Sequence, residues 1–507
     1  MTKRRYTKTN FQFSNHNHKV FSVMSNQYEN KAAMFKRFGS LITSSIFALS
    51  VTACGGGSPP KVMPIGGGDR ISGYVGNVAA DEPQAAIVAK NVLAQGGNAA
   101  DAAAALGFAL TVTLPSRASL GGGGACLAYR PGEDARAFLF LPQPVNTKAE
   151  RPAAIPMMAR GLYLMQAAYG RSDIDDILRL ISGMAQRGIT VSNAFAQDIA
   201  AVQGPLFSDP NIRKIFSRED GQPIQAGDLL SQPRLKLVYD RLITAGIGDI
   251  YIGALGQSYA KGSEMAGGGL KFEDMRNALP VEVSALSLKQ GNQNFYFLPP
   301  PADGGLGMAM AWRALSNGQG DANSVAQNAV GQWRASHSVV YTKQDSNDQQ
   351  KQAQAVLDEG NTGSGSLPVL PASTAFTVVD RNGQAVSCAL TMNNLFGTGR
   401  VAGTTGIIMA SSPQRTPIPM LTSAIVSYEN RFQAAIGASG QRDAAAAGAE
   451  TLSTLLNSSE KEDGQVAHAG TPQGRVNAIY CSRGLPGDSN RCHAYTDPQG
   501  AGIALNQ

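Results

Sequence analysis

The pattern of apolar residues changes abruptly near residue 373, and this change limits the folds open to the chain. Apolar residues recur every three or four positions over 83–113 and over much of 150–285, which predicts helices. Short apolar runs separated by turns follow, and they predict strands. These runs are 373–380, 384–392, 404–410, 423–430 and 432–439. We therefore expect a helical first part and a strand-rich last part.

A polar segment, 343–372, joins the two parts. It begins with charged and amide residues, continues with Gly and Ser, and ends with prolines. Such a composition buries little apolar surface and predicts a mobile connector.

The first 54 residues are expected to be an export leader. They carry a formal charge of +7, whereas the remainder carries −1. The excess of basic residues therefore lies in the leader, and it indicates no nucleic-acid partner. A basic pair, Lys36-Arg37, precedes the short apolar run 41–51, as in a signal peptide. Val-Thr-Ala before Cys54 resembles a lipobox and predicts lipidation of Cys54. A signal peptide of this kind would start at Met34.

The anchored protein is then expected to begin with a Gly/Pro-rich tether over 55–70. Glycine at position 55, by resemblance to bacterial lipoproteins, favours the outer membrane. A secretory signal with an incidental cysteine is the alternative.

The remaining cysteines bear on redox chemistry and metals. Cys481 and Cys492 flank a turn-rich segment and are candidates for a local disulfide in an oxidising compartment. Cys126 and Cys388 lie in apolar runs and are expected to be buried thiols. After the leader, only three scattered histidines and no CxxC occur, so we expect no metal; no cofactor is implied.

Three segments together resemble the γ-glutamyltranspeptidase family: 97–124, 297–305 and 373–407. The first carries the GGNA-type helix, a proline and a glycine run, the second reads FLPPPADGG, and the third begins STAFTVVDRNG. The resemblance implies a four-layer αββα sandwich of the α+β class, in which the fragments 71–372 and 373–507 share both sheets. These fragments would stay associated without a covalent link.

The resemblance places the nucleophile at Ser373, released by self-cleavage of the Ala372–Ser373 bond, with Thr374 as the alternative. The residues themselves favour the same chemistry. A serine hydroxyl needs a base to become a nucleophile. None of the three histidines occurs in a GxSxG elbow or another triad context. A free α-amine with a pKa near 8 would serve instead.

By the same resemblance, Thr391 bonds the nucleophile's amine and Asn393 lines the substrate pocket. The backbone N–H groups of Gly440 and Gln441 form the oxyanion hole.

The residues that hold the γ-glutamyl group in the family are replaced here. Leu141 stands for the carboxylate-binding arginine, Pro419 and Met420 for a serine pair, and Ala375 for a histidine. Segment 410–416 replaces the acidic residues that bind the amino group. We therefore expect a less polar small-molecule amide as substrate.

Two other interpretations stay open. In the first, the chain is a true γ-glutamyl hydrolase whose clamp comes from Arg117 or Arg415. In the second, it is an inactive surface lipoprotein that binds a partner.

Overall fold

The computed structural model describes residues 70–361, 363–457 and 473–506. The chain divides into two units, and the second, Val62–Gln507, contains every described residue. The expected leader 1–54, Cys54 and the tether as far as residue 69 lie outside the described residues. None of the described helices is long and apolar enough to cross a bilayer.

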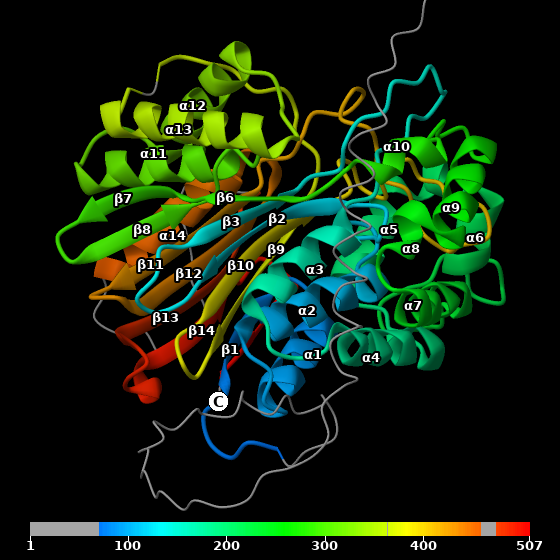
Figure 1. Cartoon of the computed structure of the whole chain (residues 1–507), viewed down its shortest axis with the longest axis horizontal. Helices are drawn as coiled ribbons and strands as arrows, with labels where there is room; N and C mark the ends of the chain where they lie inside the picture. The colour runs from blue at the N-terminus through cyan, green and yellow to red at the C-terminus, as the bar shows by residue number, and fades with distance from the viewer. Residues whose placement is uncertain (1–69, 362, 458–472, 507) are drawn as a thin grey trace, which may run out of the picture. The chain divides into compact units, whose positions relative to one another are not determined.

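Two antiparallel sheets form the centre of the second unit (Figure 1). The first sheet has seven strands in the order β15-β1-β9-β10-β2-β3-β6, and the second has six in the order β14-β13-β12-β11-β8-β7. The strands of the first sheet are β1 (Gly76–Ala80), β2 (Gly123–Tyr129), β3 (Arg136–Phe140), β6 (Val281–Ser284), β9 (Thr374–Asp380), β10 (Ala385–Thr391) and β15 (Ile503–Leu505). Those of the second are β7 (Leu286–Gln290), β8 (Gln293–Phe297), β11 (Thr422–Tyr428), β12 (Arg431–Ser439), β13 (Arg475–Leu485) and β14 (Cys492–Thr496).

Helices cover the outer face of each sheet, as Figure 1 shows. The first sheet packs against α1 (Pro83–Ala94), α2 (Ala99–Thr113) and α3 (Met158–Tyr169), and the second against α11 (Gly304–Ser316), α12 (Ala322–Ser336), α13 (Lys343–Glu359) and α14 (Ala444–Asn457). The other helices are α4 (Ile174–Arg187), α5 (Asn193–Leu206), α6 (Pro210–Phe216), α7 (Pro233–Ala245), α8 (Asp249–Ile252), α9 (Ala254–Met265) and α10 (Phe272–Arg276). A two-stranded sheet joins β4 (Ile189–Thr190) to β5 (Leu229–Leu230).

Three apolar cores fill the spaces between the four layers. Along β9, Ala375 and Val379 face the core between the sheets, whereas Phe376 and Val378 face the helices. Because both faces of the strand are buried, apolar residues occur on both of them. The expected αββα sandwich is therefore confirmed. Each sheet also draws strands from both sides of Ser373.

The two sheets approach closely beside β9. Gly437 of β12 lies so near that a Cβ added there would stand 3.1 Å from the carbonyl oxygen of Phe376. The Ser387 hydroxyl of β10 donates to the carbonyl of Ile436, 2.7 Å away. This contact brings the start of β9 close to the end of β12.

Two expectations about secondary structure were wrong. Residues 343–359 form α13 rather than a connector, with Thr342 as N-cap and Gly360 in a left-handed conformation at the C-terminus. Buried Ala353 and Leu357 attach this mostly polar helix to the outer core, and caps close both of its ends. Segment 404–410 forms isolated bridges rather than a strand.

The expectation that Cys126 and Cys388 are thiols was also wrong, because they form a disulfide with each other. They lie directly opposite on β2 and β10, where antiparallel pairing brings Cα atoms close enough for a bridge. Cys126 precedes Ser373 and Cys388 follows it, so the two parts are covalently joined, contrary to expectation.

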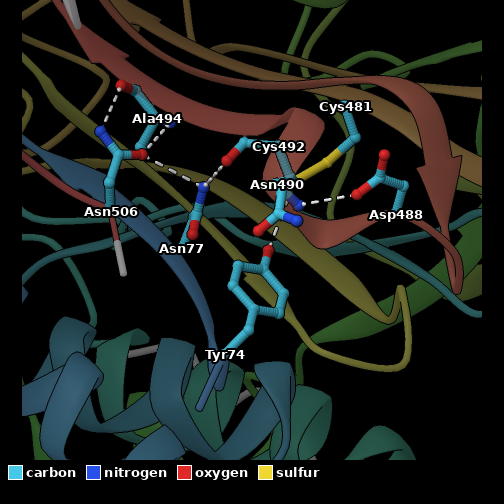
Figure 2. Close-up of a disulfide and its surroundings, with 8 residues drawn as sticks. All are labelled: Tyr74, Asn77, Cys481, Asp488, Asn490, Cys492, Ala494 and Asn506. Carbon is cyan, nitrogen blue, oxygen red and sulfur yellow. Dashed lines mark hydrogen bonds between the residues drawn. A yellow bond between two sulfur atoms is a disulfide. The ribbon is translucent and has the colours of Figure 1, made fainter.

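Cys481 and Cys492 form the second disulfide, as expected. They too lie opposite each other, on β13 and β14. Figure 2 shows its surroundings: the Tyr74 hydroxyl donates to Cys492 Sγ at 3.3 Å, and Asn77 Nδ2 donates to the Cys492 carbonyl at 2.9 Å. Both partners come from the chain before Ser373, so hydrogen bonds tie β1 to β14.

Candidate active site

Ser373 stands immediately before β9 and lines a cavity of about 290 Å³. The residue itself is almost fully buried, at 2% exposure. The preceding residue, Ala372, lines the same cavity. The peptide bond proposed for cleavage therefore lies at the wall of a hollow that admits a small molecule.

The turn after β12 supplies another part of the wall, and it contains Gly440 and Gln441. Both residues have positive φ, 115° and 55°. A Cβ at Gly440 would stand 2.1 Å from the carbonyl oxygen of Gln473, so the turn requires glycine there. Successive residues with unusual φ angles can point adjacent N–H groups at one place, as in an anion-binding nest.

Thr391 ends β10 beside the start of β9. Its hydroxyl lies 3.3 Å from the carbonyl oxygen of Ala372 and donates to it. The Thr391 hydroxyl oxygen in turn accepts the N–H of Asn393 at 2.8 Å. Because this second bond fixes the hydroxyl, Thr391 holds the carbonyl before Ser373 in one orientation.

Asn393 is fully buried, and the cavity lining does not include it. Its Nδ2 donates to the carbonyl of Ser411 at 3.0 Å, and its φ of 55° is left-handed. The structure therefore brings together Ser373, Thr391, Gly440 and Gln441, while the Asn393 amide is directed to the loop that contains Ser411.

Asp81 is a site residue that the sequence analysis missed. It lies between β1 and α1 and lines the cavity. Its carboxylate accepts hydrogen bonds from Thr374, Ala375, Ser439 and Asn477. The available signal was an acidic residue between an apolar strand and a helix N-terminus, but its partners lie about 300 to 400 residues along the chain.

The cavity wall is strongly polar, unlike the expectation of a less polar substrate. It contains two arginines, Arg117 and Arg475, together with Asp81 and four glutamines. The glutamines are Gln197, Gln441, Gln473 and Gln499.

Arg117 forms a bidentate ion pair with Asp198, through Nε at 2.8 Å and Nη2 at 2.7 Å. Burial disfavours the charged guanidinium, but the hydrogen bond and charge of Asp198 outweigh it, so the pKa of Arg117 is raised. Arg117 is therefore a permanent cation at the cavity wall. Arg415, the other candidate clamp, is not among the lining residues.

The positions that replace the family's γ-glutamyl clamp face apolar cores. Leu141 and Ala375 belong to the core between the sheets, and Met420 belongs to the core under the outer helices of the second sheet. Pro419 is buried as well. None of these four lines the cavity, so they offer no direct contact to a ligand there.

No group of three or more potential metal ligands occurs among the described residues. The polar atoms of the cavity are instead carboxylate, guanidinium, amide and hydroxyl groups on separate segments. They suit hydrogen bonding to a small polar molecule.

Comparison with known proteins agrees with this architecture. The family model for gamma-glutamyltranspeptidase matches residues 85–344, just over half of the chain. The glutathione hydrolase proenzyme of Escherichia coli (strain K12) is 26% identical over 379 residues, which cover 66% of this chain and 65% of that protein. The proenzyme of Bacillus subtilis (strain 168) is 23% identical over 466 residues, with 76% and 77% coverage. The chain thus spans just under two thirds of the length of the Escherichia coli relative.

A solved structure with the same fold is the cephalosporin acylase from Bacillus halodurans. The two agree with a TM-score of 0.67 at 16% identity, over 90% of this chain and 99% of that one. This likeness concerns the fold, whereas the family model concerns the sequence itself. The chain therefore belongs to the γ-glutamyltranspeptidase family.

Proposed function

We propose that this protein is an N-terminal-nucleophile amide hydrolase or acyltransferase that acts through Ser373. One observation carries the proposal: Ser373, the Ala372 carbonyl bonded by Thr391, and the Gly440–Gln441 turn meet at one cavity. Family membership supports amide chemistry. The matched range ends before Ser373, so the nucleophile is argued from the geometry.

The first reaction is self-cleavage. Ser373 Oγ attacks the carbonyl carbon of Ala372, and the C–N bond breaks to leave an ester. The hydroxyl proton of Ser373 passes to the departing nitrogen, which becomes a free amine. Water then hydrolyses the ester to the Ala372 carboxylate and the Ser373 hydroxyl. The Thr391 hydroxyl, 3.3 Å from the carbonyl oxygen, stabilises the negative charge that develops on it.

The second reaction is amide turnover. The new α-amine accepts the proton of Ser373 Oγ as the oxygen attacks the substrate carbonyl. The N–H groups of Gly440 and Gln441 bind the oxyanion, and the amine leaving group takes the proton. Water or an acceptor amine then releases the acyl group from the serine.

The polar wall supports a hydrogen-bonding acyl group rather than an apolar one. A second candidate is a γ-glutamyl amide, favoured by the presence of Arg117 and Arg475 in the cavity. In that case these arginines would take the place of the family clamp, because Leu141 lies in the core. The specificity is therefore proposed to differ from the family's in the residues that bind the acyl group.

Trapping the acyl-enzyme tests the activity. The processed protein is incubated with γ-glutamyl, glutaryl and phenylacetyl p-nitroanilides, quenched in acid and digested. A mass increase equal to one acyl group on the peptide that begins at Ser373 is expected, and Ser373→Thr should retain it. Ser373→Ala, which we expect to stay uncleaved, should acquire no adduct. An adduct that persists in Ser373→Ala would refute the assignment. The absence of any adduct or release would favour an inactive binding lipoprotein.

We also propose export and lipidation at Cys54, which rest on the leader sequence. Metabolic labelling with a palmitate analogue should mark the wild-type protein and leave Cys54→Ser unlabelled. Labelling of Cys54→Ser would contradict this anchor.

A further inference from the structure

The carboxylate of Asp81 joins the two halves of the proposed site. Its Oδ2 accepts hydrogen bonds from Thr374 Oγ1 at 2.9 Å, Ala375 N at 3.2 Å and Ser439 Oγ at 3.3 Å. Its Oδ1 accepts from Asn477 Nδ2 at 2.6 Å. Both oxygens of the carboxylate accept hydrogen bonds. An amide at this position would therefore turn its NH2 group toward at least one donor.

These donors come from separate strands of both sheets. Thr374 and Ala375 are the two residues after Ser373 and begin β9, whereas Ser439 ends β12 directly before Gly440. A single side chain therefore connects the backbone that bears the nucleophile with the turn that bears the oxyanion donors.

Asn477 takes part in this connection, and its own hydrogen bonds fix the orientation of its amide. Its Nδ2 also donates to the carbonyl of Ala375 at 2.9 Å, and its Oδ1 accepts from Thr496 at 3.3 Å. The amide is 1% exposed. With both ends of the amide engaged, the hydrogens of Nδ2 face Asp81 and Ala375.

Helix capping does not explain Asp81. The N-cap of α1 is the next residue, Glu82, whose carboxylate accepts the N–H of Ala85 at 2.7 Å. Asp81 instead directs its carboxylate to the cavity and to the strands that line it.

We infer that Asp81 is a positioning residue, which sets the place of Ser373 relative to the N–H groups of Gly440 and Gln441. This inference rests on the proposed function. Asp81 acts through the backbone of β9 and the β12 turn and takes no part in bond making. Its loss changes the geometry of reaction, since a displacement of about 1 Å can cost about 100-fold in rate.

The rate of self-cleavage measures this geometry without a substrate. Purified precursor of Asp81→Asn is compared with wild type by the time course of fragment appearance. We expect cleavage slower by about 100-fold, and for the processed fraction a lower kcat on glutaryl p-nitroanilide with KM within about twofold.

Asp101 provides the matched control. Its buried carboxylate also collects several hydrogen bonds, from Asn98, Gln166 and Ser172 among others, but it caps α2 and does not line the cavity. Asp101→Asn should lower the melting temperature and leave the cleavage rate of folded protein unchanged. If Asp81→Asn fails to fold, Ser439→Ala removes one donor and should slow cleavage less.

Three results would overturn the inference. They are wild-type cleavage and kcat in Asp81→Asn, an increase in KM alone, and a loss of rate that Asp101→Asn reproduces. A wild-type protein that neither cleaves nor forms an acyl-enzyme would refute the proposed function itself and, with it, this inference.

Discussion

Cys126 and Cys388 are joined across β2 and β10 by a disulfide whose two ends lie on opposite sides of Ser373. Both side chains are fully buried in the core beneath the helices of the first sheet. Cleavage before Ser373 would thus leave one covalent molecule made of two chains. The bond also joins β10, which ends at Thr391, to β2.

The first prediction follows from this bond. Processed protein should run as one species on a denaturing gel without reductant and as two with it. Cys388→Ala should give two species in both gels, because it removes the bridge between the fragments. Cys481→Ala is the control, since Cys481 and Cys492 both follow Ser373. Two separate fragments of wild type without reductant would contradict the prediction.

A second prediction concerns Thr391. Thr391→Val keeps the shape but removes the hydroxyl from the Ala372 carbonyl, so self-cleavage should slow by about 100-fold, the typical cost of one oxyanion donor. Fragment formation over time is the measurement.

Thr405 offers a matched control for this change. Its hydroxyl likewise donates to a carbonyl, that of Ala402, and accepts an N–H two residues on, that of Ile407. Thr405→Val should cleave at the wild-type rate. Equal rates for Thr391→Val and Thr405→Val would remove Thr391 from the mechanism.

The third prediction separates turnover from self-cleavage. Gly440→Ala places a methyl group against the carbonyl of Gln473, so the turn must shift and kcat should fall by about 100-fold or more. Cleavage should be affected less, because the Ala372 carbonyl is held by Thr391. Gly132, also at positive φ but with open space around it, is the control: Gly132→Ala should cost about 1 kcal/mol of stability and leave kcat unchanged.

The fourth prediction concerns stability and pH. Burial raises the pKa of Glu82, although the hydrogen bond from Ala85 offsets part of this effect. Between the ordinary and the raised pKa, the folded protein holds a proton that the unfolded chain has lost. The free energy of unfolding should therefore fall as pH rises through this window, by up to about 1.4 kcal/mol per pH unit.

Denaturation of Glu82→Gln between pH 4 and 8 tests this dependence. The variant cannot lose the proton, so its stability should vary less with pH than that of wild type. Glu282→Gln, a change in a partly exposed ion pair with Arg136, should keep the wild-type slope. An unchanged slope in Glu82→Gln would show that folding does not raise the pKa of Glu82.

The architecture was predictable from the sequence where a local pattern determines the helix or strand. The helices of 83–113 and strands β9 and β10 follow from apolar spacing, and the family motifs implied both the four layers and the shared sheets. Segment 343–359 was misassigned because its composition is polar. Its caps at Thr342 and Gly360 were signals of a helix that the composition outweighed.

The site residues were predictable only where a motif of the family includes them. Ser373, Thr391, Gly440 and Gln441 were assigned from the family resemblance, and the structure brings them together. Asp81 and the Cys126–Cys388 bond depend on contacts between residues more than 250 positions apart, which no local pattern encodes. The pairing of β2 with β10 brings the two cysteines together, and the contacts of Asp81 with Ser439 and Asn477 need the second sheet to lie close by.

The most direct test is the intact mass and N-terminal sequence of the purified wild-type protein beside Ser373→Ala. The account predicts a new N-terminus at Ser373 in wild type, with a second chain that ends at Ala372 and separates after reduction, and one unbroken chain in Ser373→Ala. An unbroken wild-type chain after prolonged incubation, or cleavage that persists in Ser373→Ala, would contradict it.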